Sequence, residues 1–190
     1  MKILGIAGSP RRGGNTNRLL AEVMRGAADK SAAVKTIFLD NLDISACHHC
    51  DACFAAGECI INDDMHMVYR ELAEADAIVL ASPIHFMGVT AQAKAMIDRC
   101  QALWARKYKL NMAPLGNRRQ RKGLFVSVGG QKDDRFFEPA LATVKSLFIS
   151  LDIEYAGKIV FPEVDDIDAL SRQPEAIKQA YLAGQKLMES

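Results

Sequence analysis

Short apolar segments alternate along this chain with longer segments whose apolar residues recur at helical spacing. The short runs predict five β-strands, at residues 3–7, 34–39, 77–81, 123–128 and 153–161. The segments between them predict five helices, which begin near Thr16, at Asp63 or Asp64, at Thr90, near Phe136 and at Pro174. The run at 77–81 contains no polar residue, as expected for a strand that is covered on both faces. This alternation favours a parallel sheet with helices on both sides.

The order of the strands follows from the way in which parallel strands are connected. Crossover connections between them are right-handed in nearly all proteins, which leaves few topologies. We therefore expect an α/β fold, a flavodoxin-like three-layer sandwich with a five-stranded parallel sheet of order 2-1-3-4-5. The length of 190 residues suits a single domain over residues 1–190. In such a sheet the loops after the first, third and fourth strands meet at one edge, where ligands bind.

The composition argues against several classes of partner. The 24 Lys and Arg residues nearly balance the 23 Asp and Glu residues, so the net charge of +1 gives no field that would attract nucleic acid or acidic lipid. No apolar run has the length needed to span a bilayer, and no signal-peptide pattern precedes the first strand. Four of the five cysteines lie close together rather than spread as a disulfide framework. We expect a cytoplasmic protein that binds neither nucleic acid nor membrane.

The four clustered cysteines follow the spacing CX2CX2CX5C, at Cys47, Cys50, Cys53 and Cys59. They lie in a long insertion, residues 40–62, and a loop of that length without structure of its own needs a reason. Thiolates at successive X2 spacings are typical of loops that wrap an iron–sulfur cube, so a 4Fe-4S cluster is the leading hypothesis. A zinc site is the second, although zinc modules usually split their ligands into two separated pairs. An empty loop, or one that forms redox disulfides, is the third.

The loop after the first strand, residues 8–17, is rich in glycine, hydroxyl and amide residues and opens a helix. Backbone N–H groups at a helix N-terminus bind anions. The loop carries neither GXGXXG nor GXXXXGK[ST], so the dinucleotide and NTPase fingerprints are absent from it. A phosphate monoester held by Ser9, Thr16 and Asn17, with Arg11 adding charge, fits this loop best. The alternative is an ordinary capped turn with solvated arginines.

The loops after the third and fourth strands carry weaker signals. Residues 82–88 form an apolar and aromatic lip that suits the edge of a flat heteroaromatic ring, or else a loop packed onto the core. His85 is a donor to a ring carbonyl, a proton shuttle or a bystander. Residues 127–131 contain Gly129 and Gly130, which permit close approach of the backbone to a ligand but equally suit a simple turn.

Together these segments resemble a known family. Residues 8–11 with 15–17, residues 82–84 with Gly88, and residues 92–99 are similar to parts of the flavodoxin-like NAD(P)H-dependent FMN reductases. The resemblance covers nearly the whole chain. The cysteine spacing narrows it to the iron–sulfur flavoprotein branch, in which a compact cysteine motif holds a 4Fe-4S cluster beside FMN.

The resemblance implies contacts to two cofactors, FMN and the cluster. The FMN phosphate would be held by Ser9, Arg11, Asn15, Thr16 and Asn17. The isoalloxazine ring would be framed by Pro83, Ile84, His85, Phe86, Met87, Gly88, Gly129 and Gly130. The cluster would be ligated by Cys47, Cys50, Cys53 and Cys59. No protein residue would be catalytic, because the redox chemistry belongs to FMN.

The resemblance also implies a function. The protein would be an FMN-dependent oxidoreductase that passes electrons between a 4Fe-4S cluster or NAD(P)H and a small acceptor. Its electron donor would be a ferredoxin or NAD(P)H, and it would assemble as a homodimer or homotetramer. Two alternatives stay open: a cluster-free NAD(P)H-dependent FMN or quinone reductase, and a non-catalytic electron carrier or redox sensor.

Three further features suit structural roles. Cys100 falls on the apolar face of its predicted helix, which indicates a core position. Asp63 and Asp64 suit the capping of a helix rather than a metal site. The basic run at residues 117–122 suits a solvated connection that leads into the fourth strand, or else a docking site for an acidic ferredoxin or the phosphate of NADPH.

Overall fold

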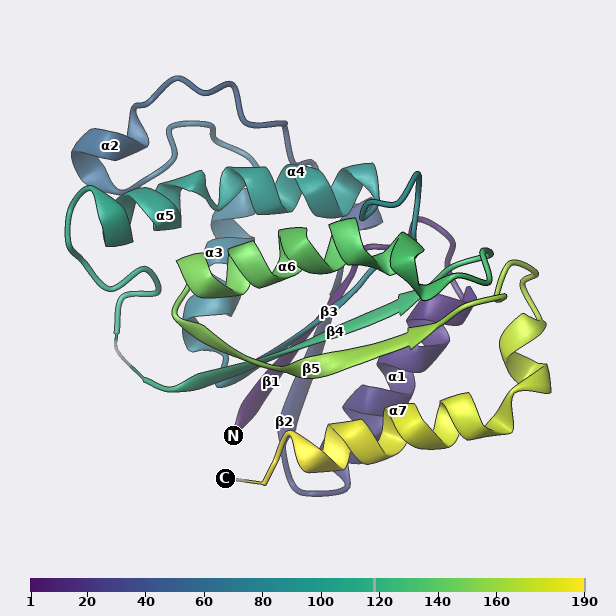
Figure 1. The fold of residues 1–190 in the computed structure, drawn as a ribbon. Helices are drawn as coiled ribbons and strands as arrows, with labels where there is room; N and C mark the ends of the chain where they lie inside the picture. The colour runs from purple at the N-terminus through teal and green to yellow at the C-terminus, as the bar shows by residue number, and fades with distance from the viewer. Residues whose placement is uncertain (118, 190) are drawn as a thin grey trace.

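The computed structural model describes residues 1–117 and 119–189, and in it five strands form one sheet of order β2-β1-β3-β4-β5 (Figure 1). The strands are β1 (Lys2–Ala7), β2 (Ala33–Phe38), β3 (Ala77–Ala81), β4 (Arg121–Val128) and β5 (Ile153–Phe161). Every neighbouring pair is parallel. The predicted fold class and strand order are therefore confirmed.

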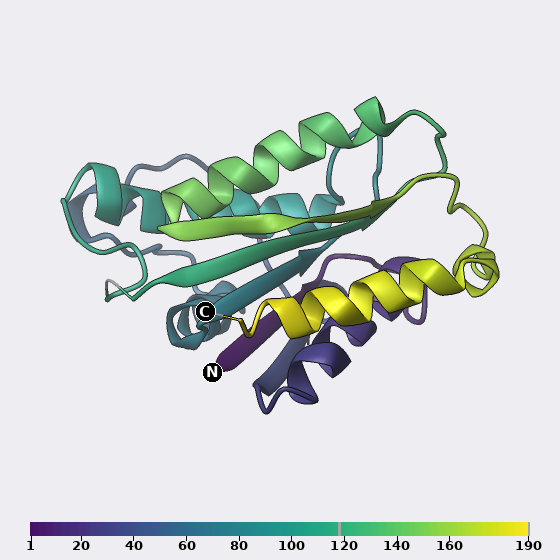
Figure 2. The ribbon, with the colours of Figure 1, turned by 60° about the horizontal axis from the view of Figure 1, so that its bottom comes forward.

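Helices cover both faces of the sheet. On one face, α1 (Asn15–Ala28) and α7 (Pro174–Lys186) lie side by side (Figures 1 and 2). The opposite layer consists of α3 (Met65–Glu74), α4 (Ala91–Arg99), α5 (Gln101–Tyr108) and α6 (Glu138–Ser150). A buried apolar core separates each helical layer from the sheet. No helix in the described part of the chain combines the length and the apolar character that crossing a membrane requires.

The helix predicted from Thr90 is interrupted once. The Thr90 hydroxyl accepts a hydrogen bond from the Ala93 N–H at 3.2 Å, which confirms its role as N-cap. The chain then bends at Cys100, where α4 ends and α5 begins. Short helical turns complete the fold: α2 (Cys53–Ala56), η1 (Leu39–Asn41), η2 (Asp134–Phe137) and η3 (Ala169–Arg172).

The basic run before β4 is not wholly solvated, which corrects the sequence-based prediction. Arg121 opens β4 and is only 2% exposed. Its guanidinium donates to the carbonyl oxygens of Ala73 and Ala75 at 2.9 and 3.0 Å, and to Oδ1 of Asn117 at 2.8 Å. It thereby satisfies carbonyl groups at the end of α3 that have no partner within the helix. Residue 118 of this run lies outside the described residues.

The loops that follow the strands are tied together at the carboxyl edge of the sheet. The Gly8 N–H donates to the Ala81 carbonyl at 2.7 Å, and the Thr90 hydroxyl donates to the Gly8 carbonyl at 2.6 Å. The Ile84 N–H donates to the Val128 carbonyl at 2.9 Å. These contacts place the loops after β1, β3 and β4 next to one another, as expected for this topology.

Candidate functional site

The loop between β1 and α1 curls tightly before the helix begins. Gly13 has a φ of 68°, a left-handed conformation that favours glycine. The Gly14 N–H closes the turn on the Arg11 carbonyl at 3.1 Å, and the Arg11 N–H donates to Oγ of Ser9 at 3.3 Å. Because Gly14 is the N-cap residue, no side chain caps α1. The first N–H groups of α1 are thus left to water or a ligand.

The side-chain amides of Asn15 and Asn17 stabilise the β1–α1 loop through hydrogen bonds. Nδ2 of Asn15 donates to the Asp166 carbonyl at 2.6 Å, and Nδ2 of Asn17 donates to the Arg11 carbonyl at 3.3 Å. Both residues are buried, and their Oδ1 atoms have no partner within the described residues. Their NH2 groups therefore hold the loop in shape. Direct contact of either residue with a cofactor stays a prediction.

Donors for an anion remain after these contacts are made. Within residues 1–117 and 119–189, no hydrogen bond engages the hydroxyl of Thr16, which lies in the first turn of α1 beside a cavity. The Arg11 side chain is exposed at the rim of the same cavity. Together with the helix N–H groups, they form a positively polarised end of the site.

Two adjoining cavities open at the carboxyl edge of the sheet. The first, of about 230 Å³, lies against the β1–α1 loop and is lined by polar residues that include Ser9, Arg11 and Thr16. The second, of about 510 Å³, is mostly apolar, and Phe86, Met87, Phe136 and Phe137 line it. Their shared wall is formed by Ile84, Gly129, Gly130 and Asp165. A polar end joined to a wide apolar end suits a ligand that has an anionic tail and a flat ring.

The lip at the second cavity is a strained hairpin turn. His85 and Gly88 exchange two backbone hydrogen bonds of 2.9 Å. Between them Phe86 and Met87 have φ values of 49° and 63°, which makes this a type I′ turn. Neither residue type favours that conformation, and the Phe86 side chain is fully exposed. Phe86 and Met87 therefore lie beside the cavity in backbone conformations that are energetically unfavourable for them.

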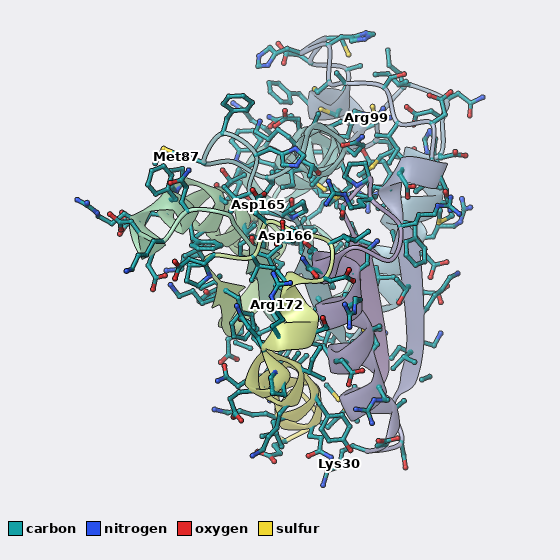
Figure 3. The ribbon with its side chains drawn as sticks, turned by 90° about the vertical axis from the view of Figure 1, so that its right-hand side faces the viewer. Lys30, Met87, Arg99, Asp165, Asp166 and Arg172 are labelled. Atoms are coloured by element: carbon teal, nitrogen blue, oxygen red, sulfur yellow. The ribbon has the colours of Figure 1, made fainter. Side chains whose placement is uncertain are left out.

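Sequence reasoning missed part of this site. Asp165 lies on the segment that follows β5 and lines both cavities; in Figure 3 it lies on a loop close to the one that carries Met87. Phe136 and Phe137 line the larger cavity from η2. The strand topology could have predicted these residues, because all strands of a parallel sheet end at the same edge. The loop after β5 should therefore have been included with the other three.

The four cysteines of the insertion face one another across a small cavity. All four are free thiols, and Cys50 is the most exposed of them. They line a cavity of about 20 Å³ together with Arg99. Burial raises the pKa of Cys53, and the neighbouring thiols of Cys59, Cys47 and Cys50 raise it further. Within residues 1–117 and 119–189, however, no three His, Cys, Asp or Glu side chains are arranged to hold a metal ion.

A buried ion pair supports the base of the cysteine loop. Nη1 and Nη2 of Arg99 donate to the two carboxylate oxygens of Asp63 at 2.5 and 3.0 Å. Asp63 also accepts from the N–H groups of Ser45 and Met65, both at 3.0 Å, and so satisfies the first N–H of α3, whereas the N-cap residue Asp64 makes no side-chain cap. Burial opposes ionisation of Asp63, but these hydrogen bonds prevail and lower its pKa. The Arg99–Asp63 pair itself could not be inferred from local sequence.

The outer part of the cysteine loop rests on α5. Nε of Arg106 donates to the Gly57 carbonyl at 2.8 Å. The rings of Phe54 and Trp104 lie 6.0 Å apart, and the Tyr108 ring follows at 5.3 Å from Trp104. Trp104 therefore packs against the cysteine loop of its own chain.

Comparison with known proteins agrees with this geometry. Residues 1–136 match the family model of the NADPH-dependent FMN reductases. An iron-sulfur flavoprotein of Methanocaldococcus jannaschii is 35% identical over 150 residues, which cover 78% of this chain and 71% of that protein. The chain belongs to the iron–sulfur flavoprotein branch of the FMN reductase family. The resemblance predicted from the sequence motifs is thereby confirmed.

For two other relatives, the match covers only about two thirds of the relative's own length. An iron-sulfur flavoprotein of Methanosarcina thermophila is 32% identical over 70% of this chain and 65% of its own length. One from Archaeoglobus fulgidus is 38% identical over 68% of this chain and 63% of its own length. The chain thus spans less than two thirds of these relatives.

Solved structures support the fold. A flavone reductase superposes on 98% of this chain and 62% of its own chain, with a TM-score of 0.74 and 22% identity. An NAD(P)H:quinone oxidoreductase from Methanothermobacter marburgensis covers 100% of this chain and 98% of its own, with a TM-score of 0.72 and 14% identity. At these identities the likeness concerns the fold alone.

Proposed function

We propose that this flavoprotein is an FMN-dependent oxidoreductase that also carries a 4Fe-4S cluster and links NAD(P)H or a one-electron donor to a small acceptor. The observation that supports this most strongly is the joined pair of cavities at the carboxyl edge of the sheet. One end offers helix N–H groups, a hydroxyl and a guanidinium, and the other offers aromatic and apolar walls. FMN has a phosphate and a flat ring to match these two ends.

The residues of the polar end would bind the phosphate of FMN. The N-terminus of α1 favours negative charge, and the Thr16 hydroxyl and the Arg11 guanidinium add two further donors. Gly129 and Gly130 would let the backbone approach the ring, while Ile84 and Phe137 would exclude water from it. Bound FMN would supply redox chemistry in steps of one or two electrons.

The cysteine loop has the donors that an iron–sulfur cluster needs. The four cysteines, Cys47, Cys50, Cys53 and Cys59, are free and line one cavity, which they share with the buried Arg99. The positive charge of Arg99 would offset thiolate charge. A 4Fe-4S cube takes one thiolate at each of its four irons, so its ligands need not converge on one point as they do around a single ion. The cluster would supply transfer of single electrons.

Several consequences belong to the same proposal. NAD(P)H would approach the ring from the wide apolar cavity, and a ferredoxin would be a suitable partner for the cluster. The 1–190 chain would act as one domain with the cysteine insertion at about 40–62, and it would work as a homodimer or homotetramer in the cytoplasm.

The phosphate assignment is tested by comparing FMN with riboflavin. A hydrogen bond to a charged group contributes about 1.5–3 kcal/mol, so Thr16→Ala should weaken FMN binding roughly 10- to 150-fold and riboflavin binding much less. Thr143→Ala, at a partly exposed position of α6 that lines neither cavity, is the matched control and should change neither affinity. Equal losses for FMN and riboflavin would rule out phosphate binding by Thr16.

The cluster assignment is tested by metal analysis after anaerobic reconstitution. We expect about four irons and four sulfides per chain in the wild type. Both should fall sharply in Cys50→Ala and stay unchanged in Cys100→Ala. Stoichiometric zinc without sulfide, or full iron content in Cys50→Ala, would contradict the proposed cluster. A protein with bound FMN but no iron would instead favour the cluster-free reductase.

A further inference from the structure

Arg99, the last residue of α4, ties together the two ends of the cysteine loop. Its Nη1 donates to the Ser45 carbonyl at 3.0 Å, two residues before the first cysteine of the motif. Its Nη2 donates to the Ile61 carbonyl at 3.3 Å, two residues after the last cysteine. The side chain is completely buried, and Asp63 occupies the outer edge of the guanidinium. One arginine therefore sets the distance between the ends of the loop.

The remaining donor of Arg99 is unused. Nε is buried and has no hydrogen-bond partner within the described residues, although an unpaired donor inside a protein is unfavourable. Arg99 lines the cavity of the four cysteines, whereas Asp63 does not. Cys59 lines the same cavity as Arg99. Figure 3 marks the position of Arg99 in the fold.

The ion pair therefore has a direction. Asp63 binds the Nη1 and Nη2 atoms of the guanidinium, and Arg99 lines the cysteine cavity whereas Asp63 does not, so the positive member of the pair is the one that borders the cysteines. Water does not reach this guanidinium, and a charge in such a site acts more strongly on its neighbours than a solvated one.

We infer that Arg99 is a positioning residue that holds the ends of the cysteine loop in register and raises the reduction potential of the cluster that the loop carries. The inference rests on the proposed cluster. Reduction adds an electron to a centre that already carries four thiolates, and a buried cation stabilises the reduced form more than the oxidised form. A hydrogen bond from Nε to a ligand sulfur acts in the same direction.

The test is a potentiometric titration of the reconstituted protein, followed by EPR for the cluster and by visible absorption for FMN. Arg99→Gln removes the charge, and Arg99→Lys keeps the charge but loses Nε. The matched control is Arg121→Lys, because Arg121 is a similarly buried arginine that does not line the cysteine cavity. The FMN potential in the same molecule is the internal reference.

We expect the cluster potential to become more negative in Arg99→Gln and to shift less in Arg99→Lys. The FMN potential should stay constant in both, and Arg121→Lys should leave both potentials unchanged. Because Arg99→Gln leaves Asp63 buried without a partner, the double variant Arg99→Gln/Asp63→Asn is measured as well. A folded Arg99→Lys protein that no longer binds iron would support the positioning role.

Three results would decide against the inference. Loaded Arg99 variants whose cluster potential equals that of the wild type would overturn it. An Arg99→Lys protein that does not fold would identify a purely structural residue and would also overturn it. A wild-type protein that takes up no iron and sulfide would instead overturn the proposed function, and the inference would fall with it.

Discussion

The thiols of Cys50 and Cys100 differ in their exposure to solvent. Cys50 is exposed in the insertion, whereas Cys100 is buried between α4 and α5. The prediction that Cys100 belongs to the core is confirmed. Burial raises the pKa of Cys100 to about 12, because the thiolate would lose its hydration without gaining a partner.

We therefore expect alkylation to distinguish the five cysteines of the cluster-free protein. At pH 8 a thiol with an ordinary pKa is partly ionised, whereas Cys100 would be ionised on the order of 1,000-fold less. Iodoacetamide followed by mass spectrometry should show modification of Cys50 within minutes and of Cys100 only after unfolding. Labelling of Cys100 at the rate of Cys50 in the folded protein would contradict its burial.

Asp63 makes the stability of the cluster-free protein depend on pH. Its pKa is lowered in the folded state, so its contribution is fully present above the unfolded value of about 3.9 and is lost as the pH falls through the folded value. Breaking a buried pair costs about 3–5 kcal/mol, and Asp63→Asn should lose that much at pH 7. Urea unfolding at pH 7 and at a pH below about 3.9 should show a smaller gap between wild type and variant at the lower pH. A gap that is the same at both pH values would contradict an ionised Asp63.

At the scale of elements, local pattern sufficed for the strands and helices but not for their contacts. The bounds of β3 and β5 coincide with those predicted, because each apolar run ends at a polar residue or a proline. Arg121 was predicted to be solvated but is buried, because its hydrogen-bond partners at Ala73 and Ala75 lie more than 40 residues away in the sequence. Asp165 was missed because the segment after β5 has no recognisable motif. Such contacts depend on topology, which periodicity alone does not specify.

The hairpin that carries Phe86 and Met87 can be relieved of its strain. A left-handed conformation costs a typical residue roughly 1–2 kcal/mol, and Asn-Gly is the sequence that type I′ turns prefer. Replacing Phe86-Met87 by Asn-Gly should therefore stabilise the FMN-free protein by roughly 1–2 kcal/mol in urea unfolding. It should also weaken FMN binding, since both side chains line the apolar cavity.

The control for the Asn-Gly substitution relieves backbone strain at a turn outside the proposed FMN site. Ser31 has a φ of 68° and lies between α1 and β2, away from both cavities. Ser31→Gly should relieve strain without changing FMN affinity. An Asn-Gly hairpin that binds FMN as tightly as the wild type would mean that the strained lip does not contact the ring.

At the scale of the whole molecule, the phosphate loop depends on a helix far along the chain. The N-terminus of α1 forms the polar cavity, and α1 packs directly against α7, which lies beyond the residues that match the family model. Glycines permit this packing: a Cβ at Gly26 would lie 2.0 Å from the Tyr181 carbonyl oxygen, and a Cβ at Gly184 would lie 1.9 Å from the Val23 carbonyl oxygen. The two helix backbones are therefore in contact.

Gly26→Ala should accordingly force α1 and α7 apart. Overpacking a core costs about 1–3 kcal/mol, and a clash with backbone atoms belongs at or above the upper end of that range. Because α1 carries the first-turn N–H groups, its displacement should also weaken FMN more than riboflavin. Thermal unfolding and flavin titration would measure both effects, with Ala21→Ser at an exposed position of the same helix as the control. A Gly26→Ala protein with wild-type stability would show that the helices separate freely, and α7 would then have no influence on the phosphate loop.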